Sequence, residues 1–405
     1  MGRSYFVDET VEEYLVGLQT APRSCLTGLL AGQSSPQRDF VVLAVQTPHR
    51  ESEGQPKASR GVSPLDDIDV EWVTEHAKQV SRMLPGGLCI LGLFLVTPPE
   101  LSKDAQNALK RLIFAMDKYI TKGRLWELSE EDVTDQVTLH ICSKTKKTVC
   151  KTFDVKDPKS SAKPADWKYQ TGVSSSWPML TCSVEVDVQI PVSSDITDKC
   201  MKDGLRRWTK QIEAAYCLIN GRQALDDSEL SSGQVKTSFC HSTEQSELDE
   251  RSSALVQVCS GSVKVRGVVY CRAYIHNNKP KARHAAQAIK RDIINTVCSR
   301  VEMFLEDLLI DEGSHKGLCS GQQALPRRVF APMPISGLSV CDYMFPDEST
   351  ADVAERLKEM LDCETPEEDI DTGLEGNQCM FPICVAVTAA IALLATATSL
   401  LYFNE

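Results

Sequence analysis

The feature that most constrains this chain is an uncharged, apolar run near its C-terminus. Residues 381–403 contain no Asp, Glu, Lys or Arg. As a helix this run would be about 34 Å long, enough to cross a hydrocarbon core of about 30 Å. The alternative is a buried core helix, but such helices are rarely free of charge over this length, so a transmembrane helix is predicted. Its apolar members include Phe381, Ile383, Val385, Ile391, Leu394, Leu400 and Phe403.

The position of this span predicts how the chain meets the membrane. Only Asn404 and Glu405 follow it, so we expect a tail anchor that inserts after synthesis, with residues 1–378 on the cytosolic side. No Lys or Arg flanks the span, so the distribution of positive charge does not indicate an orientation. The run is only moderately apolar, which suits a thin membrane such as that of the endoplasmic reticulum. We therefore expect a single-pass protein of the endoplasmic reticulum membrane.

The composition of the whole chain argues against several classes of partner and site. The net charge of −12 would repel a phosphate backbone, so nucleic acid is not an expected partner. The 16 cysteines include no Cys-x-x-Cys pair, so a structural zinc site is not expected. Several cysteines lie in apolar strand patterns, where a thiol behaves as a small buried hydrophobe, namely Cys89, Cys182, Cys259 and Cys271.

Residues 1–155 predict one α/β domain. Apolar residues with helical spacing indicate helices over 11–18, 73–84 and 101–120. Strand patterns fall at 24–32, 39–47, 88–96, 137–141 and 149–155, and residues 48–66 are predicted to form a loop. The run 88–96 is almost wholly apolar, which is typical of a strand buried on both faces. We expect a mixed sheet between helices, an α/β/α sandwich.

Residues 156–362 predict a second α/β domain. Strands are expected at 184–190, 254–259, 263–275, 327–332 and 338–344, with helices at 197–218, 281–309 and 348–362. Residues 222–253 are rich in Ser and acids and are predicted to be a flexible insertion. Residues 363–380 form an acidic linker to the span, because 363–378 hold six acids and no Lys or Arg.

The two halves share one sequence similarity. A shift of 180 residues aligns 87–113 with 267–293 without gaps, and Lys110-Arg111 then coincides with Lys290-Arg291. Each segment predicts a strand, a loop and a helix. A diverged repeat would give this pattern, and so would any buried strand that precedes a packed helix, so both explanations stay open.

Motifs that would indicate catalysis or a cofactor were not found. The seven histidines form no His-x-x-x-His pair, and there is no phosphate-binding glycine loop or Gly-x-Ser-x-Gly. His76 and His140 are each expected to be structural or surface residues. The basic residues of 279–291 and the Arg206-Arg207-Trp208 group are expected to be solvated helix faces, although 279–291 could also meet an acidic partner or a phosphate surface. No cofactor, metal or catalytic residue is therefore predicted.

The first half resembles an MPN domain in a short glycine pattern and in its order of elements. The pattern is Thr27-Gly28-Leu29-Leu30-Ala31-Gly32, followed later by Gly92–Pro98 and Leu101–Asp104. In active MPN domains two histidines and a later aspartate bind zinc. Leu95 and Thr97 stand where the imidazoles would be, and Asp104 alone is not a site. The resemblance therefore implies an inactive module of the kind that pairs with a related subunit.

A longer resemblance covers nearly the whole chain. Strings such as 79–87, 157–162, 164–170 and 271–276 resemble the family of odorant response abnormal protein four, which carries a C-terminal span in the same place. This resemblance implies trafficking of some G-protein-coupled receptors through the endoplasmic reticulum. It also implies anchoring of the cysteine protease that removes the ubiquitin-fold modifier, a protease with its own MPN-like N-terminal part.

Two functions of different class follow from these resemblances. The first is a non-enzymatic, tail-anchored adaptor that binds the protease or a receptor. The second is a membrane-tethered metallo-isopeptidase of the MPN class. Stoichiometric zinc together with peptidase activity would favour the second function.

Overall fold

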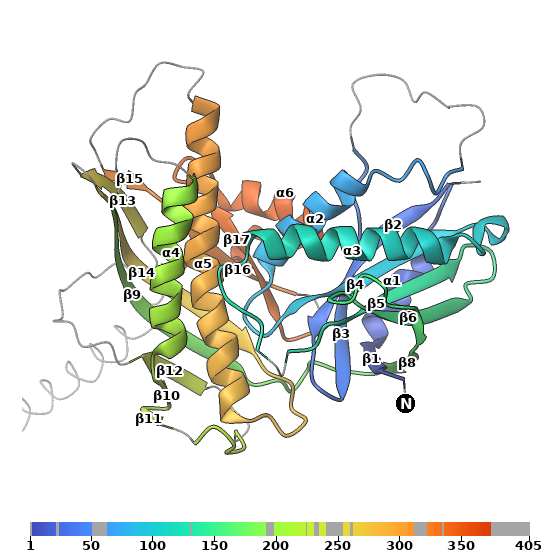
Figure 1. Ribbon diagram of the computed structural model, residues 1–405, viewed down its shortest axis with the longest axis horizontal. Helices are drawn as coiled ribbons and strands as arrows, with labels where there is room; N and C mark the ends of the chain where they lie inside the picture. The colour runs from blue at the N-terminus through green and yellow to red at the C-terminus, as the bar shows by residue number, and fades with distance from the viewer. Residues whose placement is uncertain are drawn as a thin grey trace, which may run out of the picture. The chain divides into compact units, whose positions relative to one another are not determined.

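Two β-sheets, each with helices packed on it, organise the chain in the computed structural model (Figure 1). Met1–Ile370 form one compact unit. The predicted span at 381–403 lies outside the described residues, and none of the described helices is long and apolar enough to cross a membrane. The structure describes residues 2–21, 24–50, 63–129, 132–191, 198–223, 225–230, 235–239, 254–259, 262–311, 322–333 and 336–373.

The first sheet is mixed, as predicted, and has eight strands in the order β7-β6-β5-β4-β2-β3-β1-β8. The pairs β4–β5, β1–β3 and β1–β8 are parallel and the other pairs are antiparallel. The strands are β1 (Ser4–Asp8), β2 (Leu26–Gln33), β3 (Arg38–Gln46), β4 (Cys89–Thr97), β5 (Asp135–Cys142), β6 (Thr148–Asp154), β7 (Lys163–Pro164) and β8 (Asp166–Gln170).

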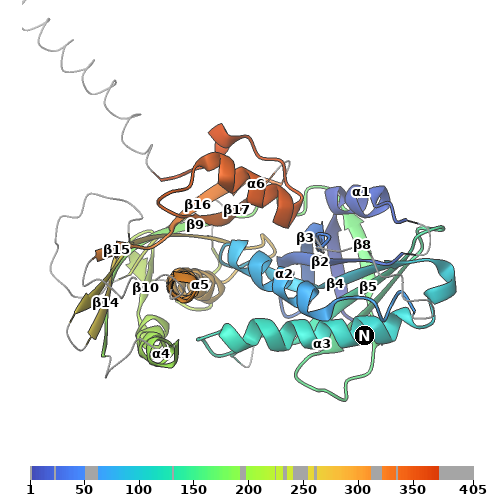
Figure 2. The same cartoon turned by 90° about the horizontal axis from the view of Figure 1, so that it is seen from above.

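Helices cover both faces of this sheet (Figure 2). On one face lies α1 (Glu9–Gly17), and on the other lie α2 (Val70–Met83) and α3 (Ala105–Gly123), which the short 3₁₀ turn Pro99–Leu101 precedes. β4 alternates between the two cores: Leu95 packs with the α2 and α3 side, and Phe94 packs with the α1 side. This arrangement explains why 88–96 is apolar throughout and confirms that the strand is buried on both faces.

Three strands of the first sheet were not predicted from the sequence. β1 is short, and the two edge strands are weakly buried: β7 is exposed, and β8 alternates between exposed and half-buried positions. None of the three therefore has a strong apolar pattern. β7 and β8 also carry the first sheet past residue 155, the predicted end of the first domain. An edge strand needs only one apolar face, which makes its signal weak in a sequence.

The second sheet has seven strands in the order β11-β10-β12-β9-β14-β13-β15. Its long central strands β9 and β14 pair antiparallel along their whole length, and α4 (Asp198–Ala214) and α5 (Ala282–Asp311) pack in its core. β11 and β12 fall inside 222–253, so part of the predicted insertion joins this sheet. The strands are β9 (Met179–Pro191), β10 (Cys217–Ile219), β11 (Arg222–Gln223), β12 (Val235–Phe239), β13 (Ala254–Cys259), β14 (Ser262–Tyr274) and β15 (Gln322–Ala324).

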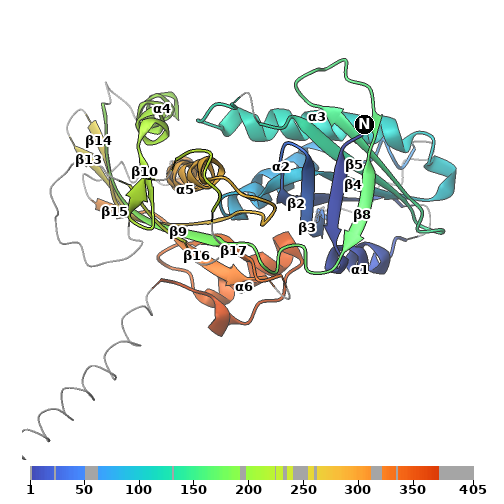
Figure 3. The ribbon, with the colours of Figure 1, turned by 90° about the horizontal axis from the view of Figure 1, so that it is seen from below.

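The C-terminal elements return to the core of the first sheet (Figure 3). The hairpin of β16 (Arg327–Pro332) and β17 (Ser339–Met344), then α6 (Thr350–Leu361), occur where the sequence predicts them. After a 3₁₀ turn (Glu367–Asp369), Ile370 is still buried, as is Cys363. The prediction of a solvated linker from 363 is therefore wrong for its first part, because these two apolar side chains pack while the acids around them stay solvated.

Hydrogen bonds to backbone groups join the two sheets. The N–H of Gly86 donates to the carbonyl of Arg272 at 2.9 Å, and its carbonyl accepts from the N–H of Tyr274 at 2.8 Å. Gln33 Nε2 donates to the carbonyl of Tyr274 at 2.7 Å. The two segments of the internal similarity, β4–α3 and β14–α5, are each a strand followed by a helix, but their common origin stays a prediction.

Candidate functional site

The residues predicted from the MPN resemblance to occupy degenerate metal positions are buried in the first sheet. Leu95 and Thr97 on β4 both have no exposed surface. Thr97 Oγ1 lies 2.9 Å from Nε2 of His140 on the neighbouring strand β5. Burial lowers the pKa of His140, which favours the neutral ring. His140 is thus a buried structural residue that hydrogen-bonds Thr97.

Asp104 occupies a separate place. It stands at the N-terminal cap of α3, where its side chain makes no capping hydrogen bond, and it borders a hollow with Asp66 and Arg111. The hydrogen bonds of the described residues include none from Asp104 to Thr97 or His140. Within the described part of the chain, no group of three or more His, Cys, Asp or Glu residues could hold a metal ion.

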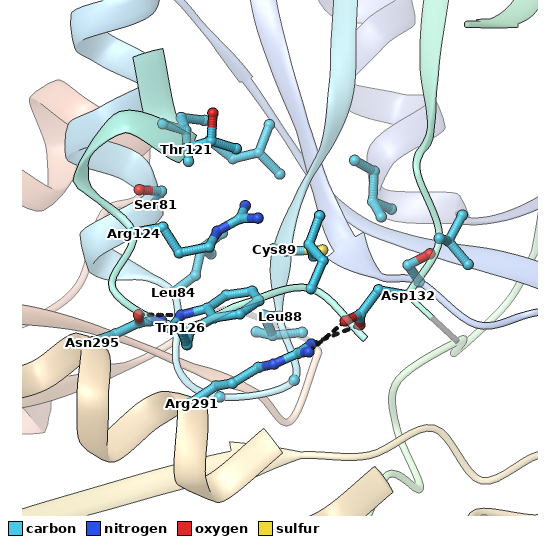
Figure 4. A pocket seen from close by; sticks show the side chains of 18 of the residues that line it. Ser81, Leu84, Leu88, Cys89, Thr121, Arg124, Trp126, Asp132, Arg291 and Asn295 are labelled. Carbon is cyan, nitrogen blue, oxygen red and sulfur yellow. Dashed lines mark hydrogen bonds and ion pairs between the residues drawn. The ribbon is translucent and has the colours of Figure 1, made fainter. Parts of the chain in front are cut away.

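The main cavity lies elsewhere and has a volume of about 500 Å³. Residues from α2 and from the start of β4 form one wall, the segment that follows α3 forms a second, and α5 forms a third (Figure 4). Helix α5 packs on the second sheet, whereas α2, α3 and β4 belong to the first, so the cavity lies between the two. We treat this cavity as the candidate functional site, because ligand sites of soluble proteins are usually concave and of this size.

An indole between two guanidinium groups dominates the cavity wall (Figure 4). The Cζ atoms of Arg124 and Arg291 lie 4.3 and 4.1 Å from the centre of the Trp126 ring, on opposite sides of it. Trp126 Nε1 donates to Asn295 Oδ1 at 2.9 Å. Cation–π contact with both faces and this hydrogen bond hold the ring in one orientation.

The two arginines that flank Trp126 differ in whether they have a carboxylate partner. Arg291 makes a bidentate pair with Asp132, at 2.9 and 2.6 Å. Among the described residues, no carboxylate pairs with Arg124. Burial lowers the pKa of Arg124; Asp117 opposes this effect and the charge of Arg291 adds to it. Arg124 is therefore a partly desolvated cation with spare hydrogen-bond donors.

Cys89 was predicted to be a buried hydrophobe, and this prediction is wrong. The residue opens β4, where the strand borders the cavity, and it is exposed there (Figure 4). Solvent reaches the thiol, but desolvation by the neighbouring protein raises its pKa to about 11. Cys182 and Cys271 are buried as predicted, and the side chain of Cys259 lies outside the described set.

The basic segment 279–291 also differs from its prediction as a solvated helix face. Arg291 is one wall of the cavity, and its side chain is only 21% exposed. Sequence reasoning missed Arg124, Trp126 and Asp132 as well. The available signal was a tryptophan in a polar segment between two predicted elements, but its partner Arg291 is far away in the chain and was not recognisable.

Comparisons with known proteins identify the family. The family model described as "ODR4-like: Odorant response abnormal 4-like" matches residues 28–372. The mouse Protein odr-4 homolog is 49% identical, over 94% of this chain and 88% of that protein, and the human one is 48% identical over the same shares. The Odorant response abnormal protein 4 of Caenorhabditis elegans is 20% identical over 83% of this chain and 71% of that protein.

Solved structures that match this chain include one of a C. elegans protein. The crystal structure of UfSP from C. elegans matches with a TM-score of 0.44 and 8% sequence identity, over 89% of this chain and 57% of that one. A likeness this weak carries no argument about function, and the MPN-like character of the first half stays a prediction. The family model and the curated relatives together establish that this chain belongs to the odorant response abnormal 4-like family.

Proposed function

We propose that this chain is a non-enzymatic adaptor that supports trafficking of a subset of G-protein-coupled receptors through the endoplasmic reticulum. The observation that carries the proposal is the family match over nearly the whole chain, which includes a worm relative named for an abnormal odorant response. The relatives named as odr-4 homologs match over most of their own length, so the adaptor would use the same body as they do.

In this proposal the adaptor also binds the cysteine protease that removes the ubiquitin-fold modifier and anchors it at the membrane. Residues 381–403 would be the anchor and the body would face the cytosol. Two features support a binding role rather than hydrolysis. Leu95 offers no lone pair to a metal, and the hydroxyl of Thr97 is already engaged by His140. The MPN-like half would therefore hold a partner and not process a substrate.

Purification of the full chain from membranes in mild detergent tests the proposal. We expect the protease to co-purify in a stoichiometric amount, and we expect no stoichiometric zinc and no isopeptidase activity of the chain alone. A variant that lacks 381–403 should keep the protease but leave the membrane fraction. Bound zinc with peptidase activity would establish the metallo-isopeptidase instead, and a variant that stays on membranes would refute the anchor.

Exposed apolar side chains allow the binding half to be tested. Val16 on α1 and Val149 on β6 are exposed in the part of the chain that forms the first sheet. Tyr216 and Leu225 are exposed near the second sheet. We expect the double variant V16E/V149E to lose co-purifying protease. The matched double variant Y216E/L225E should retain it. The reverse result would place the partner on the second sheet.

A further inference from the structure

The cavity between the two sheets contains a cation, Arg124, that pairs with no carboxylate among the described residues. Three arginines line it. Arg82 pairs with Glu302 and Glu306, and Arg291 pairs with Asp132. Within the described lining, Arg124 is the arginine that has no carboxylate partner. A buried or half-buried guanidinium normally has an acceptor, because desolvation of an unpaired charge is costly.

Burial lowers the pKa of Arg124 and the charge of Asp117 opposes this effect, but the two side chains form no ion pair among the described residues. Asp117 also lines the cavity, but its Oδ1 accepts a hydrogen bond from Gln136 Nε2 at 3.1 Å. Burial raises the pKa of Asp117, and the charge of Arg124 opposes this effect. Arg291, on the far side of Trp126, adds positive charge to the same region. Arg124 therefore has no ion-pair partner in the described lining, and an incoming anion would supply one.

The guanidinium of Arg124 is also held in place before any ligand arrives. Its Cζ lies 4.3 Å from the centre of the Trp126 ring, and that ring is held by Asn295 and by Arg291 on its other side. Among the described residues the N–H donors of the Arg124 side chain make no hydrogen bond, so they are available to a ligand. In Figure 4 the edge points into the cavity, toward Cys89. A fixed fork of donors matches the two oxygens of a carboxylate or phosphate group and loses little entropy on binding.

The rest of the cavity suits an organic body attached to the anion. Leu84, Leu88 and Leu125 contribute apolar surface to its lining. The volume of about 500 Å³ far exceeds that of a bare inorganic ion. We propose that this cavity binds a small organic oxyanion, a carboxylate or a phosphate ester, with the anionic group on Arg124 and the apolar body against the leucines. This site is separate from the proposed protein-binding surface and does not depend on it.

Cys89 provides a local reporter for a test with the full-length chain in detergent. Its thiol lies in the cavity, so a bound ligand should slow its alkylation by iodoacetamide, measured by mass spectrometry of the Cys89 peptide. Cys217 is a matched internal control, because its pKa is also raised to about 11 by desolvation and it does not line the cavity. The probes are phenyl phosphate, phenylacetate and, as the neutral control, benzyl alcohol.

We expect phenyl phosphate, phenylacetate or both to protect Cys89 and leave Cys217 unchanged, with benzyl alcohol giving no protection. Which anion protects more strongly identifies the headgroup class. R124Q should weaken the apparent affinity about tenfold or more, because a charge-assisted hydrogen bond is lost. R206Q removes an exposed arginine outside the cavity and should bind as the wild type does.

Protection is compared with and without probe in each variant, because loss of Arg124 also changes the reactivity of the free Cys89 thiol. Equal protection by benzyl alcohol would overturn the proposal, as would the absence of protection by both anions at millimolar concentration. Undiminished protection in R124Q would do the same. If R124Q fails to fold, as shown by rapid alkylation of its buried Cys271, the comparison of charged and neutral probes on the wild type still decides the question.

Discussion

The carboxylate of Asp292 on α5 accepts two hydrogen bonds from the guanidinium of Arg328 on β16, at 2.6 and 2.9 Å. Both side chains are only 2% exposed. Arg328 also donates to Thr296 Oγ1 at 2.8 Å and to Cys341 Sγ at 3.1 Å. Because α5 packs on the second sheet and β16 lies in the core of the first, this buried pair ties the two together.

The substitution Asp292→Asn should destabilise the fold strongly. It leaves the positive charge of Arg328 buried without its counter-ion, which costs about 3–5 kcal/mol. Urea unfolding monitored by tryptophan fluorescence measures the loss. The matched control is Asp187→Asn, which removes an exposed ion pair with Lys264 and should cost less than about 1 kcal/mol. Similar losses for both variants would show that the buried pair contributes little.

Replacement of Arg300 on α5 should have the opposite effect on stability. Its side chain is 1% exposed, and its three guanidinium nitrogens find no hydrogen-bond partner among the described residues. Burial lowers its pKa to about 10. Arg300→Met should therefore stabilise the protein by about 1–3 kcal/mol, seen as a higher Tm. Arg328→Met should lower the Tm, because it leaves Asp292 unpaired. A destabilised Arg300→Met variant would mean that Arg300 has an acceptor in the folded chain.

Gly87 should not tolerate a side chain. Its φ of +81° lies in the left-handed region, and an added Cβ would lie 2.0 Å from the carbonyl oxygen of Tyr274. Gly87→Ala should cost about 2–4 kcal/mol and loosen the contact between β14 and the turn after α2. Gly17 at the end of α1 has open space around it, so Gly17→Ala should be neutral or slightly stabilising. Equal unfolding midpoints for the two variants would argue against this close approach.

His276 predicts a fall in stability at mildly acidic pH. Desolvation, with smaller effects of His284 and Arg38, lowers its pKa to about 4, below the ordinary value of 6.5. The neutral ring accepts a hydrogen bond from the N–H of Asn278 at Nδ1, which protonation would remove. The contribution is thus present above pH 6.5 and is lost as the pH falls from 6.5 toward 4. Unfolding free energies measured across this window should fall less steeply in His276→Gln; identical slopes would exclude His276 as the cause.

Elements with two apolar faces, or with a clear helical stripe, could be predicted from the sequence. β4 was recognisable because both of its faces are buried, and α2, α3, α5 and α6 because their apolar residues recur with helical spacing. β8 was missed because it is an edge strand with a weak apolar pattern, and β1 was missed because it has only five residues. The globular part was predicted to end at residue 362, which is too early. Acids flank Ile370, so the local composition gives no sign that this side chain is buried.

The candidate cavity could not be predicted, for a different reason. Arg124 and Trp126 follow α3, Cys89 begins β4, and Arg291 lies on α5, so no local pattern links them. The sequence by itself determined which segments must be buried and where helices and strands form, because these depend on the spacing of apolar residues along the chain. Only the tertiary structure decided which charges are neutralised and which cysteine reaches solvent, because these depend on which distant segments pack side by side.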